Sequence, residues 1–222
     1  MKIAVLGTGV VGRSIAGKLL ELGHEVYMGT RDPEQTQNME KDDFRMSDWL
    51  GDHEVYLVTF SEAATAAEML VNCSGGMVSL EVLRMANADD QGNKILLDVA
   101  NPLDFSKGFP PTLNPCNDDS LGEQIQRNYP NLRVVKSLNT MNCDLMVQPS
   151  LVPGNHQVFM SGDDAEAKAT VSSLLQSFGW GENRIIDLGG IETAKGAEQL
   201  LPIWLRLMQA KGSVMFNFAI IE

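Results

Sequence analysis

The chain has 222 residues, 44% hydrophobic and 21% charged, which is typical of a globular protein with one large core or a nucleotide domain and a small annex. Its net charge of −12 argues against nucleic acid or an anionic membrane as a partner. The three cysteines show no metal-ligand spacing, so we expect reduced thiols and no metal site. No apolar run approaches membrane-spanning length and a strand follows Met1 directly, so we expect a cytoplasmic protein.

The first predicted unit is a strand, a glycine turn, a helix and a second strand. Residues 3–6 form a short apolar run, and the glycines of the following GTGVVG segment have GxGxxG spacing. A helical period of apolar residues then continues to Gly23, and residues 25–28 predict the next strand. A GxGxxG segment between a strand and a helix is typical of a dinucleotide-binding βαβ unit.

Each glycine of this turn has a physical role in such a unit. Gly7 allows the tight turn, Gly9 lets the backbone approach a pyrophosphate, and Gly12 lets the helix pack closely on the strand. The helix that begins near Val10 and Val11 offers free N–H groups and a positive dipole to the phosphates.

The end of the second strand indicates which dinucleotide binds. An NAD site usually has an acidic residue here for the ribose 2′-hydroxyl, whereas this chain has Thr30 and Arg31, which suit a 2′-phosphate. Asp32 is either a displaced ribose ligand or the cap of a helix that begins at Pro33. We favour NADP, and in this acidic chain Arg13 and Arg31 are the candidate sources of local positive charge.

The next elements alternate between helix and strand. The predicted helices cover residues 33–41, 62–71, 77–88 and 120–128, and the predicted strands cover residues 44–46, 54–60, 94–100 and 132–138. Residues 104–119 contain Phe105, Phe109 and three prolines and are expected to form a long loop, either a lid or a disordered insertion.

The strands of this alternation end at Gly7, Thr30, Phe60, Asn101 and Asn139. In a parallel sheet all five positions lie along the carboxyl edge, where ligands bind at the switch in strand order. The sequence therefore predicts a cleft at this edge.

The last third of the chain repeats the alternation on a smaller scale. A connector at 147–155 precedes a strand at 156–161, a helix capped by Asp163 and Glu166, a strand at 184–188 and a long helix at 192–211 that Pro202 should kink. We predict an α/β protein with a Rossmann doubly wound parallel sheet at 1–145 and a small C-terminal α/β domain at 146–222.

No acid–base constellation is evident. His24 and His53 precede strands, and for His156 a structural role is favoured over one in the cleft. Hydride transfer between two redox cofactors requires orientation and exclusion of water more than it requires a protein acid, so this absence is compatible with such a reaction.

Several blocks resemble the NADPH-dependent reductases of the factor-420 deazaflavin coenzyme. They are GTGVVG with Gly29-Thr30-Arg31, DVANPL at 98–103, VVKSLNT at 134–140, MSGDDA at 160–165 and FNFAI at 216–220. The nucleotide part is also similar to the cytosolic part of membrane ferric reductases.

The resemblance implies direct hydride exchange between NADP(H) and a deazaflavin or flavin acceptor, often in a homodimer. It implies that Ile191 and Thr193 lie near the acceptor rings. Together with the strand ends it gives two predicted sets. The cofactor-binding set is Gly7, Thr8, Gly9, Val10, Val11, Gly12, Thr30, Arg31, Phe60, Asn101 and Pro102, and the catalytic set is Asn139, Thr140, Met141 and Thr193.

Two departures affect the acceptor side. Asn139 stands where reductases of this kind can carry a histidine, and the loop after Asp104 looks longer than expected. Two alternatives therefore stay open. One is an NADPH-dependent carbonyl or imine reductase, although such enzymes need a long all-helical second domain. The other is a non-catalytic NADP(H)-sensing protein, which only the acceptor side distinguishes.

Overall fold

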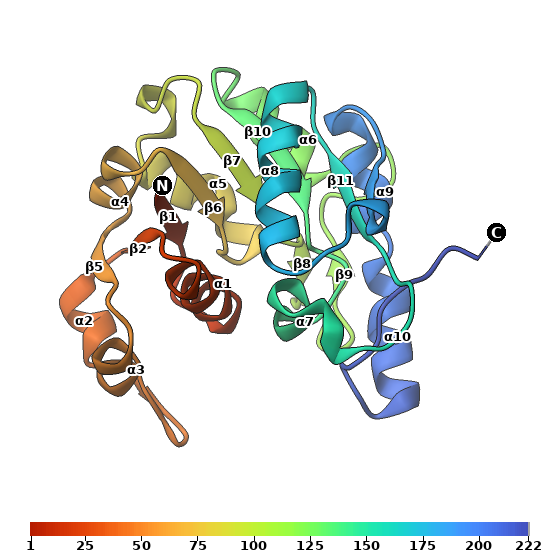
Figure 1. The fold of residues 1–222 in the computed structure, drawn as a ribbon, viewed down its shortest axis with the longest axis horizontal. Helices are drawn as coiled ribbons and strands as arrows, with labels where there is room; N and C mark the ends of the chain where they lie inside the picture. Colours follow the sequence, from red (N-terminus) through yellow and green to blue (C-terminus); the bar gives the residue numbers. More distant parts are fainter. Residues whose placement is uncertain (222) are drawn as a thin grey trace.

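The structure, a computed structural model, describes residues 1–221 and is built around one eight-stranded sheet (Figure 1). Its strands are β1 (Lys2–Leu6), β2 (Glu25–Thr30), β5 (Tyr56–Thr59), β6 (Met69–Asn72), β7 (Ile95–Asp98), β10 (Arg133–Ser137), β11 (Val158–Ser161) and β12 (Ile185–Asp187). Their spatial order is β12-β11-β10-β7-β6-β1-β2-β5.

Six neighbouring strands of this sheet, β10, β7, β6, β1, β2 and β5, are all parallel. From β1 the chain first adds strands on one side, β2 and β5, and then on the other, β6, β7 and β10. This is the predicted Rossmann doubly wound sheet. β11 pairs antiparallel with β10 and parallel with β12, so the C-terminal strands extend the same sheet. The predicted boundary after residue 145 falls inside α7 (Cys143–Val147), and the division into two domains stays a prediction.

Helices cover both faces of the sheet and enclose two hydrophobic cores. One face carries α1 (Val10–Glu21), α7 and α8 (Ala165–Ser177), which stand in front of the sheet in Figure 1. The other face carries α4 (Phe60–Ala66), α5 (Ser79–Met85), α6 (Leu121–Asn128) and α9 (Ala194–Glu198). Such an arrangement leaves the carboxyl ends of the parallel strands open to a ligand.

Short elements complete the chain. They are α2 (Pro33–Gln37), β3 (Glu40–Lys41), β4 (Phe44–Arg45), α3 (Met46–Asp52), η1 (Gly76–Val78), η2 (Ala88–Asp90), β8 (Leu103–Asp104), β9 (Thr112–Leu113), η3 (Pro149–Leu151), η4 (Glu182–Arg184), η5 (Ile191–Thr193) and α10 (Leu201–Lys211). Within residues 1–221 no helix combines the length and the apolar character that crossing a membrane requires.

The predicted helix at 62–71 is wrong in its second half. α4 ends at Ala66, and residues 69–72 form β6, which lies between β1 and β7. All four residues of β6 are buried because helices cover both faces of the sheet. A short, continuous apolar run of this kind has the same pattern in a buried strand and in a helix, and the alanines before it favoured the helix.

Other predicted boundaries need smaller corrections. The helix at 33–41 ends at Gln37. The helix that follows the strand at 156–161 is capped by Asp164 and not by Asp163; the Asp164 carboxylate accepts from Ala167 N at 2.7 Å. The long helix at 192–211 is interrupted, and Pro202 lies in the first turn of α10, where a missing N–H costs nothing.

The long segment after Asp104 is folded back on itself. β8 and β9 pair antiparallel within it, and Phe105 and Phe109 are each 57% exposed. That it acts as a lid stays a prediction.

Candidate cofactor-binding site

The glycine turn between β1 and α1 has the geometry that a dinucleotide site requires. Gly7 has φ +127°, and its N–H donates to Gly29 O at 3.1 Å. A Cβ on Gly12 would lie 2.1 Å from Gly7 O, so only glycine fits there. A Cβ on Gly9 would meet no atom within 4 Å. The space over Gly9, at the N-terminus of α1, is therefore open to a pyrophosphate.

The first turn of α1 brings a cation to this position. Val10 is 60% exposed, whereas Val11 packs against the core. Arg13 donates to Thr8 O at 2.9 Å, and its guanidinium lies 3.8 Å from the centre of the Phe44 ring. The positive charge of Arg13 is thus held beside the turn.

The end of β2 carries the residues expected at a 2′-phosphate. Thr30 is buried, and its hydroxyl lies 2.7 Å from Thr36 Oγ1. The exposed Arg31 guanidinium lies 3.6 Å from the Glu81 carboxylate. Asp32 accepts from Gln35 N at 2.9 Å, which confirms its interpretation as a helix cap.

The ends of β7 and β10 are joined by two amides. Asn101 Nδ2 donates to Asn139 O at 2.7 Å, and Asn139 Nδ2 donates to Asn101 Oδ1 at 2.9 Å. Leu138, just before Asn139, has φ +64°, a conformation that costs free energy in a bulky residue and often occurs at functional sites.

Two buried polar atoms at this place have no partner within residues 1–221. They are Asn139 Oδ1 and Thr140 Oγ1, and both residues are 1% exposed. An unpaired buried acceptor or hydroxyl costs about 1–3 kcal/mol, so the described residues leave two costly polar groups at this place. The neighbouring Met141 is buried and adds an apolar wall.

The loop after β6 also belongs to this edge, although its sequence did not predict this. A Cβ on Gly76 would lie 2.1 Å from Asn101 O, so the loop packs on the backbone of the β7 exit. Ser74 donates to Asn72 Oδ1 at 2.6 Å. The CSGG segment at 73–76 is a glycine-rich turn of the kind that follows a strand at a binding edge. It predicts this position only when residues 69–72 are known to form a strand.

The remaining predicted residues are embedded in the structure. Phe60 and Ile191 have their side chains in the hydrophobic core, and Pro102 is buried. The Thr193 hydroxyl lies 2.7 Å from both Ser161 Oγ and Gly190 O. Whether these residues contact a cofactor stays a prediction.

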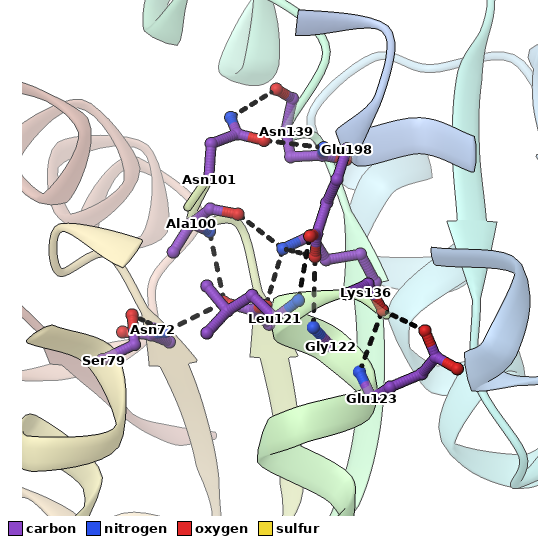
Figure 2. Close-up of polar contacts among 12 residues, drawn as sticks. Asn72, Ser79, Ala100, Asn101, Leu121, Gly122, Glu123, Lys136, Asn139 and Glu198 are labelled. Carbon is purple, nitrogen blue, oxygen red and sulfur yellow. Dashed lines mark hydrogen bonds and ion pairs between the residues drawn. The ribbon is translucent and has the colours of Figure 1, made fainter. Parts of the chain in front are cut away.

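A fully buried ionic cluster lies beside the carboxyl ends of β7 and β10 (Figure 2). Lys136 Nζ lies 2.8 Å from Asp98 Oδ2 and 2.9 Å from Glu198 Oε1, and it also donates to Ala100 O. The Glu198 carboxylate accepts from the N–H groups of Leu121 and Gly122, at the N-terminus of α6. We call Asp98, Lys136 and Glu198 the ionic cluster.

The register of the sheet explains this cluster. Asn72, Asp98, Lys136 and Ser161 are Cα partners across four neighbouring strands, so they form one polar row. Asn72 Nδ2 donates to Asp98 Oδ1 at 2.8 Å. Burial by itself lowers the pKa of Lys136, but the two carboxylates outweigh it and raise that pKa above its usual value. The two carboxylates thus favour the charged form of Lys136.

His156 does not reach the cleft. It is 3% exposed, and its Nε2–H points at Pro149 O and Val152 O, at 3.0 and 3.1 Å. Its Nδ1 accepts from Asn217 Nδ2 at 2.9 Å, so both ring nitrogens are used. The structural interpretation of His156 is confirmed.

The doubly wound sheet and the glycine turn define a dinucleotide-binding protein of the Rossmann class. Residues 2–102 match the family model described as NADP oxidoreductase, coenzyme F420-dependent. A solved structure from Arthrobacter sp. FB24, provisionally named an F420-dependent NADP reductase, is 54% identical, covers 100% of both chains and superposes with a TM-score of 0.95.

Two further relatives align along nearly all of the chain. The F420-dependent NADP reductase of Methanothermobacter marburgensis is 27% identical over 93% of this chain and 92% of its own length. The metalloreductase STEAP3 of Rattus norvegicus is 28% identical over 91% of this chain, which spans only 38% of that protein. The chain belongs to the coenzyme F420-dependent NADP oxidoreductase family. As the sequence predicted, it is an NADP-dependent oxidoreductase.

Proposed function

We propose that the protein transfers a hydride between NADP(H) and a deazaflavin coenzyme of the F420 type, with other flavins as weaker acceptors. The observation that carries this proposal is the pair of unsatisfied buried atoms, Asn139 Oδ1 and Thr140 Oγ1, just after the carboxyl end of β10. Homodimer assembly and a cytoplasmic location belong to the same proposal.

The nucleotide end of NADP(H) fits the residues of β1, α1 and β2. Gly9 leaves room for the pyrophosphate against the N-terminus of α1, and the exposed Arg31 can exchange its ion pair with Glu81 for charge-assisted hydrogen bonds with a 2′-phosphate. When bound, NADP(H) supplies or accepts the hydride.

The nicotinamide end fits the exits of β7 and β10. The Asn139 oxygen can accept from a carboxamide N–H, and the Thr140 hydroxyl can donate to a carboxamide oxygen or accept from its N–H. Asn101 holds Asn139 in place through two hydrogen bonds. These residues orient the nicotinamide ring and exclude water, and hydride transfer requires both from the protein.

The names of two relatives support the deazaflavin acceptor. Both the Arthrobacter protein, which this chain matches from end to end, and the Methanothermobacter reductase are named for coenzyme F420. A carbonyl or imine reductase needs a proton donor for its product. Asn139, Thr140 and Met141 have no such proton near neutral pH, and His156 is engaged elsewhere.

The test is to mix the purified protein with NADPH and each of three acceptors: the deazaflavin, a free flavin and an imine. We expect NADPH oxidation to match deazaflavin reduction mole for mole and to be fastest with this acceptor. NADH in place of NADPH is the matched control for the 2′-phosphate. Imine reduction without reduction of either flavin-type acceptor would contradict the proposal.

A further inference from the structure

Stability alone does not explain why the three side chains of the ionic cluster are buried together. Replacing a buried ion pair by apolar residues of similar volume is often neutral or stabilising, whereas removing one partner is costly. Here the side chains of Asp98, Lys136 and Glu198 are 0%, 0% and 2% exposed. Three ionisable groups kept away from water beside the exits of β7 and β10 suggest a role in the geometry of those exits.

The contacts of Lys136 lead directly to the groups expected at the nicotinamide. Its Nζ donates to Ala100 O, and the next residue, Asn101, forms the two hydrogen bonds with Asn139. Asp98 also accepts from Ala100 N at 3.2 Å. The peptide at Ala100 is therefore held at both its N–H and its carbonyl by the cluster (Figure 2).

The cluster itself is anchored on elements outside the cleft. Glu198 belongs to α9 and is held by two N–H groups of α6 at 2.9 and 3.1 Å. The partial positive charge of that helix N-terminus balances the second carboxylate. Lys136 is thus held in place by Glu198 and α6, which lie outside the predicted nicotinamide site.

We propose that Lys136 is a positioning residue of the hydride transfer: by holding the Ala100 carbonyl, its ammonium group fixes Asn101 against Asn139 and so keeps the unsatisfied Asn139 and Thr140 oxygens aimed at the nicotinamide. This inference rests on the proposed function. Because the phosphate contacts lie on β1, α1 and β2, loss of Lys136 disturbs the orientation of the ring and leaves most of the affinity for NADPH.

The decisive variant is the double substitution Lys136→Met/Glu198→Gln. It removes the Ala100 contact but keeps the net charge of the cluster, since one cation and one carboxylate are lost together. The charge control is Glu198→Gln alone, which keeps the Nζ contacts with Asp98 and Ala100. The stability control is Val171→Ala, which opens a cavity in α8 on the other face of the sheet.

We expect the double variant to slow the single-turnover hydride step by about tenfold to a hundredfold, while the Kd for NADPH changes less than about threefold. Glu198→Gln, which keeps the contact of Lys136 with Ala100 O, is expected to slow the hydride step less than the double variant does, and Val171→Ala is expected to slow it less than about threefold. In the cofactor-free protein, backbone hydrogen exchange at 99–103 and 137–141 is expected to quicken in the double variant only.

An unchanged hydride step and unchanged exchange in the double variant would overturn the positioning role. So would equal slowing in Val171→Ala, because a general loss of stability would then suffice. If the double variant does not fold, Lys136→Gln/Glu198→Gln, which keeps a donor for Asp98, replaces it. Failure of both to fold would also contradict the inference, because the cluster would then be a condition of folding.

The exchange experiment separates this inference from the proposed function. A wild-type protein that transfers no hydride to any flavin-type acceptor contradicts the proposed function. Unchanged exchange at the two strand exits contradicts the role of Lys136 whatever the acceptor is.

Discussion

The β1–α1–β2 unit and the paired exits of β7 and β10 lie at the same carboxyl edge of the sheet. The amino-acid sequence specifies these two regions in different ways. In the first, one continuous stretch of sequence contains the turn, the helix start and the phosphate-binding residues. In the second, Asn101 and Asn139 meet across 38 residues of chain, supported by Lys136 and by Glu198 from still farther along the sequence. The first region depends on local backbone geometry and the second on sheet register.

The largest expected effects distinguish two glycines of the first region. Gly12→Ala places a Cβ 2.1 Å from Gly7 O, where backbone must move, so we expect a loss of roughly 3 kcal/mol in the free energy of unfolding. Gly9→Val meets open space, so the cofactor-free protein keeps its Tm, while NADPH affinity falls by about a hundredfold or more because the pyrophosphate's place is taken. Thermal unfolding and NADPH titration measure both. Unfolding of the Gly9→Val protein would show that Gly9 is a packing residue.

Arg31→Ala tests the choice between the two dinucleotides. Losing hydrogen bonds to a charged group costs about 1.5–3 kcal/mol, so NADPH affinity should fall by about tenfold to a hundredfold. NADH has no 2′-phosphate, and its affinity should be nearly unchanged. Calorimetric titration with both cofactors gives the comparison, and equal losses for both would contradict the assignment of Arg31.

Thr140→Val tests the second region without changing its shape. The buried hydroxyl has no partner within the described residues, so its removal should raise the free energy of unfolding of the cofactor-free protein by about 1 kcal/mol. The hydride step should slow by about tenfold, since an orienting group is lost. A lower stability together with an unchanged hydride step would mean that Thr140 serves the fold and not the cofactor.

Glu81→Gln should give the smallest effect on NADPH affinity, and it should raise this affinity, whereas Arg31→Ala lowers it. Glu81 lies 3.6 Å from Arg31 with both side chains more than half exposed, so a 2′-phosphate has to compete with it. Exposed ion pairs are worth about 0.2–1 kcal/mol, which predicts an NADPH affinity higher in the variant by a factor of about 1.4 to 5. Weaker NADPH binding in Glu81→Gln would show that the carboxylate helps to hold the cofactor.

The two regions also differ in how far the sequence predicted them. GxGxxG between a strand and a helix is a local pattern, and Thr30, Arg31 and the Asp32 cap follow from residues close by. The position of β6 was missed because four buried apolar residues after an alanine-rich stretch have no distinguishing period.

The ionic cluster shows why the rest was not predictable. Asp98 ends an otherwise apolar strand and Lys136 directly follows two valines in β10, but only the parallel register of β7 and β10 makes them partners. Glu198 joins them through the packing of α9 on α6, which no local pattern encodes. The unsatisfied atoms of Asn139 and Thr140 likewise become visible only when their surroundings are known.

The pH dependence of the single-turnover hydride step tests the central claim, that the protein orients two redox rings and donates no proton, most directly. The expected profile is nearly flat between about pH 6 and 8, because Asn139, Thr140 and Met141 do not titrate there. His156→Ala should lower stability, since three hydrogen bonds are lost, but change the hydride step less than about threefold. A steep single-proton dependence that disappears in a His156 or aspartate variant would contradict the account and favour a carbonyl or imine reductase.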